Sequence, residues 1–273
     1  MTVRRVHAVL AAGIENPALI ARWREEPDLL RDHGIDPSQV NLDALWKFAG
    51  LTVKVRHNAL RHDMPGAFRL MSVAGLEIEL FAAYASDCAA RRMKLAPTTE
   101  GRALDLLAFL EGWLDRERLA HALLWDLIRH ERALGSLTRS TTASGSSPNL
   151  KAVEPPMRPS PSVVPRIQGA IVLHEMTSDP QVIAAALQTS APDLAAIPRA
   201  PAHVCYWRPT ANPEVSILKL DELGFFTLSL IDGVRTAAEV YRALGGGRRP
   251  SAGFLGVLGD LQKLGIAVLR RPR

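Results

Sequence analysis

Histidines near carboxylates or other histidines are the first candidates for metal chemistry in this sequence. His57 and His62 are five residues apart, so an ideal helix would present them on different faces. His121 and Asp126 likewise lack the i, i+4 spacing with which one helix face holds a metal ion. We therefore expect no metal site in this chain, and solvated side chains at His57 and His62.

Cys88 is the candidate for nucleophilic chemistry. Arg91 and Arg92 follow it by about one helical turn and would favour a thiolate, but no paired histidine is evident in the sequence. The only other cysteine is Cys205, and no CxxC spacing points to a zinc knuckle or a disulfide framework. A buried, inert Cys88 is the expectation, and a reducing cytoplasm is the expected compartment.

Known catalytic motifs are absent from the sequence. It has no Walker loop, no GxGxxG after a strand, no GxSxG elbow and no HExxH. The Gly-rich run at residues 245–250 is not followed by Lys-Ser or Lys-Thr, so it reads as a turn rather than a phosphate cradle. The chain is therefore expected to be a binding protein and not an enzyme. An enzyme that uses Cys88 or the histidines remains the rival.

Composition indicates a globular protein of two domains. The 273 residues are 47% hydrophobic and 22% charged, and no run approaches the roughly 18 apolar residues of a membrane span. Residues 1–135 hold 18 Lys or Arg and 18 Asp or Glu, so the net charge of +5 comes from the rest of the chain. Arginine clusters at residues 248–249 and 270–273 are expected to be solvated, with phosphate or an acidic peptide as the alternative.

Residues 136–165 divide the chain. More than half of this stretch is Ser, Thr or Pro, which predicts a linker because it has little apolar surface to bury. Residues 1–135 show three- and four-residue apolar spacing, with Asn-Pro and Asp-Pro pairs at 16–17 and 36–37 that are typical of helix starts. They predict at least five helices in one antiparallel bundle.

Residues 166–273 predict a mixed domain. Strand-like runs lie at 167–173, 203–207 and 215–220, with a helix between the first two at 180–188. Two short helices hinged at Asp232-Gly233 follow, then a helix at 251–264 and a last strand at 266–269. The fold class expected for the whole chain is α+β. This order is typical of a winged helix, which binds either DNA or peptides.

The segments 218–224, 230–240 and 254–266 resemble the peptide chaperone PqqD and related RiPP recognition elements. The family pattern is a strand, "LN-x-x-g", "l-x-DG-x-r-T-x-x-E-i" and "f-L-x-x-L-x-x-x-G", and Asp221 stands here where Asn is common. In that family the leader of a precursor peptide adds as a strand beside the last strand before the first helix. The resemblance implies these peptide-binding residues: Val215, Ile217, Lys219, Phe254, Leu258 and Leu261. Plain core packing is the alternative for the last three.

Residues 25–61 are similar to the helical domain of accessory proteins that accompany multinuclear non-haem iron-dependent oxidases. In those heterodimers the oxidase is a separate TIM barrel that holds the iron, and the accessory protein presents the peptide. The resemblance implies iron only in the partner and no cofactor in this chain. The expected partner-binding residues form one aromatic and basic helix: Trp46, Lys47, Lys54, Arg56, His57 and Arg61. The alternative is that Trp46 is core and the basic residues are its solvated face.

A DNA-binding regulator is the second hypothesis, with residues 251–264 as the recognition helix. That helix has one Lys, one Gln and one Asp but no Arg to read guanine. It would read a groove poorly, so nucleic acid is not the expected partner. Replacing Phe254 with Asp is expected to abolish leader binding if the first hypothesis holds.

Overall fold

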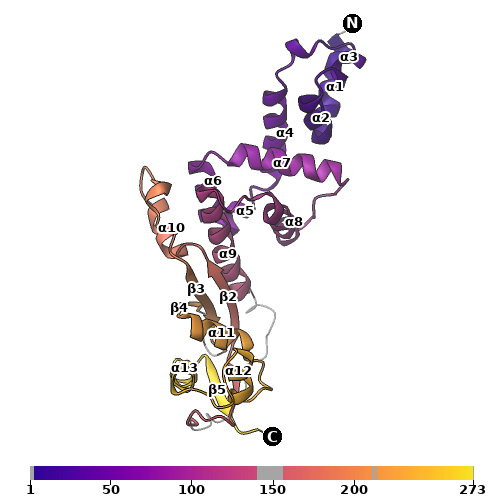
Figure 1. The fold of residues 1–273 in the computed structure, drawn as a ribbon. Helices are drawn as coiled ribbons and strands as arrows, with labels where there is room; N and C mark the ends of the chain where they lie inside the picture. Colours follow the sequence, from indigo (N-terminus) through magenta and orange to yellow (C-terminus); the bar gives the residue numbers. More distant parts are fainter. Residues whose placement is uncertain (1–2, 140–155, 211, 213, 273) are drawn as a thin grey trace. The chain divides into compact units, whose positions relative to one another are not determined.

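The protein is described by a computed structural model over residues 3–139, 156–210, 212 and 214–272 (Figure 1). The chain forms two compact units. We call Met1–Ile128 with Ala184–Ala196 the helical unit, and Arg129–Ile183 with Ile197–Arg273 the sheet unit. The elements are helices and small antiparallel sheets, as the predicted α+β class requires.

The part of the helical unit up to Ile128 consists of helices and the first half of α9. Their first and last residues are α1 Val3–Glu15, α2 Pro17–Glu25, α3 Leu29–Asp32, η1 Pro37–Gln39, α4 Leu42–Arg56, α5 Leu60–Asp63, α6 Pro65–Val73, α7 Glu77–Ala90, α8 Thr99–Trp113 and α9 Leu119–Arg139. Pro17 opens α2 as predicted. The Asp36-Pro37 pair begins only the 3₁₀ helix η1, and α4 starts later because Asn41 accepts a hydrogen bond from the Ala44 amide at 2.9 Å.

The helices of this unit do not form the expected antiparallel bundle. Gly75, at φ 68°, separates α6 from α7 as the sequence indicates, but α7 then runs across α4 rather than alongside it (Figure 1). Gly50 of α4 lies against Ala82 of α7 at this crossing, with no side chain between the two backbones. The close approach of two helices at small residues is therefore what sets their arrangement, and the apolar spacing alone did not reveal it.

The sheet unit contains two antiparallel sheets. Strands β2 Ala170–Met176, β3 Ala202–Arg208 and β4 Ser216–Leu220 form one in the order β2-β3-β4, and β1 Val164–Ile167 pairs with β5 Ala267–Arg270 in the other. The predicted strand at 167–173 is thus two strands, because Gly169, at φ 91°, turns the chain between them. Helix α10 Pro180–Leu187 and the 3₁₀ helix η2 Leu194–Ala196 separate β2 from β3.

Three helices follow β4, each with the cap that its sequence provides. Asp221 caps α11 Glu222–Leu230 by accepting from the Gly224 amide at 2.7 Å, and Ser251 caps α13 Ala252–Lys263. Thr236 and Glu239 form a capping box at α12 Ala237–Ala243. The Asp-Gly hinge is confirmed: Gly233 has φ 79°, and Asp232 accepts from two following amides.

Both faces of the three-stranded sheet are covered. On one face Val215 and Ile217 pack with Tyr206 and with the second half of α9, through Ala133 and Leu137. On the other face α11 and α13 pack through a separate cluster that holds Leu218, Leu220, Leu228 and Leu261. Because side chains alternate along a strand, Ile217 contributes to the first cluster and Leu218 and Leu220 contribute to the second, whereas Ser216 and Lys219 of β4 are polar.

Both ends of the predicted linker belong to the fold instead. At its start, Leu137 in the last turn of α9 is buried against the sheet. At its end, Val163 is buried between α12 and α13, and β1 begins at Val164. The remaining part of that prediction, residues 140–155, lies outside the described residues.

Candidate functional site

Strand β4 is the outer strand of its sheet. It pairs with β3 only, from Leu220 opposite His203 to Ser216 opposite Trp207, and no strand among the described residues pairs with its other edge. An outer strand has backbone N–H and C=O groups directed away from the sheet, and these can bind a further extended chain. At the opposite edge, the Glu175 carbonyl of β2 already accepts a hydrogen bond from the Arg129 side chain.

The residues predicted to bind a peptide lie on two different faces of the sheet. Ile217 and Lys219 stand opposite Tyr206 and Val204, which belong to the face that α9 covers. Leu261 packs on the face that α11 and α13 cover. One groove cannot therefore be lined by both predicted sets, because the sheet separates them.

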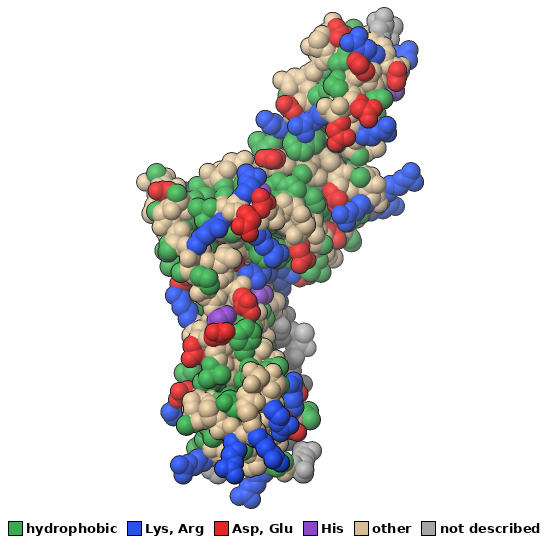
Figure 2. All heavy atoms as spheres, viewed as in Figure 1, with side chains coloured by type: hydrophobic (Ala, Val, Ile, Leu, Met, Phe, Trp, Pro, Cys, Tyr) green, Lys and Arg blue, Asp and Glu red, His purple; other side chains and the backbone are tan. Residues whose placement is uncertain are grey.

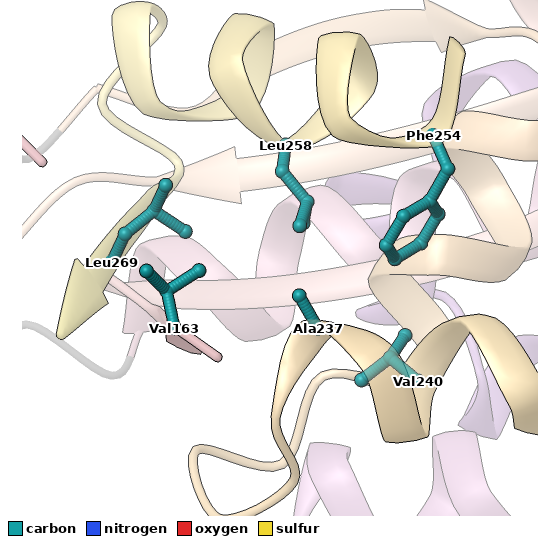
Figure 3. Close-up of a cluster of buried hydrophobic side chains, with 6 residues drawn as sticks. All are labelled: Val163, Ala237, Val240, Phe254, Leu258 and Leu269. Carbon is teal, nitrogen blue, oxygen red and sulfur yellow. The ribbon is translucent and has the colours of Figure 1, made fainter. Parts of the chain in front are cut away.

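Phe254, Leu258 and Leu261 are core residues. Their exposed fractions are 0, 0 and 3%. Phe254 and Leu258 point from α13 into a closed cluster with four other side chains, drawn in Figure 3: Val163, Ala237, Val240 and Leu269. These three side chains pack α13 against the rest of the unit and leave almost no surface for a ligand. Their spacing therefore reflects core packing and not a peptide-binding wall.

Lys219 lies beside a cavity of about 360 Å³ at the Leu220 end of β4. Lys219 forms an ion pair with Asp179, and Asp179 also accepts from the Gln181 amide at 2.9 Å. His203, on the far wall, stacks on Phe225 with ring centroids 4.6 Å apart. The lining is otherwise apolar: Val182, Pro198, Ala200, Pro201, Ala202 and Leu220. No sequence motif indicated this cavity, because its walls come from α10, β3, β4 and the loop before β3.

Trp46 is half-buried in the helical unit rather than free on its surface. Its Nε1 donates to Ser86 Oγ at 3.0 Å, and the Arg24 guanidinium lies 4.3 Å from the ring centroid. With Phe109 and Trp113 it lines an open hollow of about 870 Å³. Trp46 thus has a structural role and also keeps part of its surface available.

The basic residues predicted on one helix lie on two, because α4 ends at Arg56 and Arg61 belongs to α5, and their surroundings differ. Lys54 and Arg61 both bind Glu77 of α7, Lys54 with an N–O distance of 2.9 Å, so their charges are used within the unit. Lys47 and Arg56 are exposed. Of the basic residues predicted on this helix, these two are left to face a partner.

Three exposed apolar side chains of α4 lie together on its surface, and of these only Phe48 belongs to the aromatic and basic helix predicted from the sequence. Phe48, Leu51 and Val55 are 52, 42 and 60% exposed and lie on one face, since they are three and four residues apart. In Figure 2 hydrophobic side chains reach the surface in the region of α4 and α7. Their spacing was visible in the sequence, but only the burial of Ala49 and Val53 shows which side of the helix is the core.

His57 is buried, and its prediction as a solvated, partner-binding residue is wrong. Its exposed fraction is 0%, Nδ1 lies 2.9 Å from the Val53 carbonyl oxygen, and the ring packs edge-on against Tyr84 at 5.3 Å. Burial lowers the pKa of His57. The residue comes directly after α4, and its ring closes the space between α4 and α7.

Acidification is expected to destabilise the helical unit through His57. A histidine whose folded pKa lies below its unfolded value of about 6.5 is neutral in the native state, so its stabilisation is present above pH 6.5 and is lost as the pH falls below it. For one histidine, the free energy of unfolding falls by at most about 1.4 kcal/mol per pH unit. His57→Leu should therefore flatten the pH dependence of urea unfolding between pH 7 and 5.

His62→Leu is the matched control for that experiment, since His62 is exposed and lies five residues further along the chain, in α5. Its pH profile should equal that of the unsubstituted protein. A profile that His57→Leu leaves unchanged would mean that His121 and His130, whose pKa values burial also lowers, account for the acid sensitivity.

The other candidates for chemistry are buried. Burial raises the pKa of the Cys88 thiol and outweighs the lowering effect of Arg91, which pairs with Asp87 at 2.8 Å. Burial also raises the pKa of Cys205 to about 12. Among the described residues no three His, Cys, Asp or Glu side chains come together as a metal-binding group.

Arginine side chains gather at one end of the sheet unit. Arg248, Arg249, Arg270 and Arg271 are exposed, and Figure 2 shows Lys and Arg side chains gathered at the end of the sheet unit where β5 lies.

Within the described ranges, no helix combines the length and the apolar character needed to cross a bilayer. Compared with known proteins, the sequence matches no family model and no curated protein.

Proposed function

We propose that this chain is a non-catalytic partner subunit that binds the leader of a ribosomally made precursor peptide as an extra strand on β4. The free edge of β4 is the observation that carries the proposal, since β4 is the last strand before α11 and is bonded on one side only. Backbone hydrogen bonds to such an edge supply affinity for an extended chain with little demand on its sequence.

The order of elements supports a PqqD-like winged helix in the sheet unit. Strand β4 and helices α11, α12 and α13 follow one another in the order of that family's pattern, which is a strand and then three helical segments. The capping residues Asp221, Thr236 and Ser251 lie within the segments that resemble the family. On this proposal α13 supports the sheet from one face, and the peptide gains its contacts at the edge and on the other face.

The helical unit is the proposed docking surface for a separate iron-dependent oxidase of the TIM-barrel type. Phe48, Leu51 and Val55 offer it an apolar stripe, and Lys47 and Arg56 flank that stripe with free charges. Adjacent exposed apolar side chains rimmed by polar ones are typical of protein interfaces. The iron and the oxidation chemistry would belong to the partner, and this chain would position the peptide.

A DNA-binding role has less support. Among the polar residues of α13, Asp260 and Lys263 are paired with each other at 2.8 Å, and Gln262 is half-buried. A helix without a free basic side chain on its outer face has little with which to bind phosphate or read guanine.

Hydrogen exchange of the full chain, with and without a candidate precursor peptide and a candidate oxidase, tests the proposal. The precursor should slow exchange of the amides at 216–220, and the oxidase should slow exchange within α4. N-methylation along the leader should weaken binding at every second residue, because alternate amides face β4, by roughly 2- to 10-fold for each lost hydrogen bond. Protection confined to the helical unit on adding the precursor would overturn the assignment of roles.

A further inference from the structure

We propose that the cavity beside Lys219 takes one large apolar side chain of the peptide that adds to β4, so that it selects the peptide by this anchor. The inference rests on the proposed function and adds a recognition rule to it. With about 360 Å³ the cavity is at the lower end of the range of ligand sites, roughly 300–1,000 Å³. That size has room for one large side chain.

The chemistry of the walls favours an uncharged occupant. Six of the lining residues are Val, Pro, Ala or Leu. The two opposite charges, Lys219 and Asp179, already neutralise each other in an ion pair, and Asp179 is satisfied further by the Gln181 amide. A charged side chain would have to displace that pair, whereas Leu, Ile, Phe, Tyr or Trp would remove apolar wall from water without breaking it.

The pairing of the added peptide with β4 determines which peptide residue enters the cavity. On an added strand, the residue directly opposite Lys219 lies on the same face of the sheet, with its Cβ about 4.5–5.5 Å away. Lys219 itself lines the cavity, so a long side chain at that position can reach it. The residue two positions along the peptide lies beside Ile217, which is partly buried on the α9 face. The expected pattern is therefore two apolar residues separated by one, with the larger at the Lys219 end.

A phage-displayed library of random 12-residue peptides, selected on the full chain, tests this rule. We expect enrichment of Leu, Ile or an aromatic residue at one position, and slowed exchange of amides 216–220 when an enriched peptide is added. Replacing the anchor of that peptide with alanine should weaken binding roughly 10- to 100-fold, the value of one buried apolar side chain.

Two variants of the chain test whether the anchor side chain of the peptide binds in the cavity. Ala200 is exposed on the loop before β3, and Ala200→Trp should fill the cavity, weakening the enriched peptide roughly 10-fold or more but leaving its alanine version unaffected. Val182→Asp should shift selection toward Lys or Arg at the anchor. Ala243→Trp, at an exposed position of α12 away from the cavity, is the matched control and should change nothing.

The outcomes separate this inference from the proposed function. Peptides that protect 216–220 but bind Ala200→Trp as well as the unsubstituted chain would overturn the anchor cavity and leave strand addition intact. If no enriched peptide protects 216–220, strand addition itself fails and the anchor fails with it. Loss of binding in Ala243→Trp as well would mean that tryptophan disturbs the unit generally, and this too counts against the cavity.

Discussion

Replacing Phe254 with alanine is expected to lower the free energy of unfolding of the sheet unit by about 3–5 kcal/mol. Phe254 is 0% exposed, and its ring centroid lies 5.1 Å from that of Tyr241. Removing the ring takes contacts from Ala237 and Val240 and leaves a cavity between α12 and α13. Since domains are stable by only about 5–15 kcal/mol, this change alone could unfold the unit.

Phe226→Ala is the control for this prediction. Phe226 is also a phenylalanine of the sheet unit, but it is 37% exposed and contacts only the rings of His203 and Phe225 among its aromatic neighbours in the described residues. Its loss should cost about 1 kcal/mol or less. Urea unfolding followed by hydrogen exchange of the sheet-unit amides measures both variants, and equal effects would contradict the placement of Phe254 in the core.

The burial of Phe254 also changes what Phe254→Asp can show. An unpaired carboxylate in this cluster is expected to unfold the unit, so leader binding would be lost whether or not Phe254 touches the leader. Variants at the β4 edge and at Ala200 test binding without disturbing the core, which is why they replace Phe254→Asp as the experiment.

Replacing Gly50 with alanine is expected to destabilise the helical unit by about 1–3 kcal/mol. A Cβ at Gly50 would lie 2.4 Å from the amide nitrogen and 2.5 Å from the Cα of Ala82. Both atoms belong to the backbone of α7, so relief requires the two helices to move apart. Alanine is the better helix former by about 1 kcal/mol, and the clash must exceed that gain for the variant to be less stable.

Gly112→Ala isolates the helix-propensity gain. Gly112 lies in the last turn of α8, and a Cβ there would meet nothing within 4 Å. This variant should be more stable by about 0.4–1 kcal/mol. Urea unfolding monitored by hydrogen exchange of the α4 and α7 amides compares the two. If Gly50→Ala were as stable as Gly112→Ala, the close crossing of α4 and α7 would be wrong.

The local elements of the sheet unit could be predicted well. Ser251 caps a helix where its sequence indicated, Asp232-Gly233 turns where it was expected to, and the helix at 180–188 matches α10 to within one residue. Caps and turns depend on hydrogen bonds between residues two or three apart, so a short stretch of sequence is enough to predict them.

The binding surfaces could be predicted only in part. The strand before α11 was identified correctly from its apolar, β-branched residues, and the structure shows that its outer edge is free. The helices that cover each face of the sheet were not predicted. Val215 and Phe254 were assigned to one groove, but Val215 packs on the face that α9 covers, and Phe254 is buried in the core between α12 and α13. His57 was predicted to be solvated because its side chain is polar. The structure instead buries it against Tyr84 of α7, where α4 and α7 cross.

The sequence by itself predicted the α+β class, the helix that begins at Ser251, the Asp232-Gly233 hinge and the strand before α11. Tertiary structure alone decided which side of α4 is exposed, which residues of α13 are core, and that Asp179, Ala200 and Lys219 meet around one cavity. The physical reason is distance along the chain. Hydrogen bonds of caps and turns are local, whereas burial and cavities arise where residues tens of positions apart pack together, and their types alone do not specify the neighbours they meet.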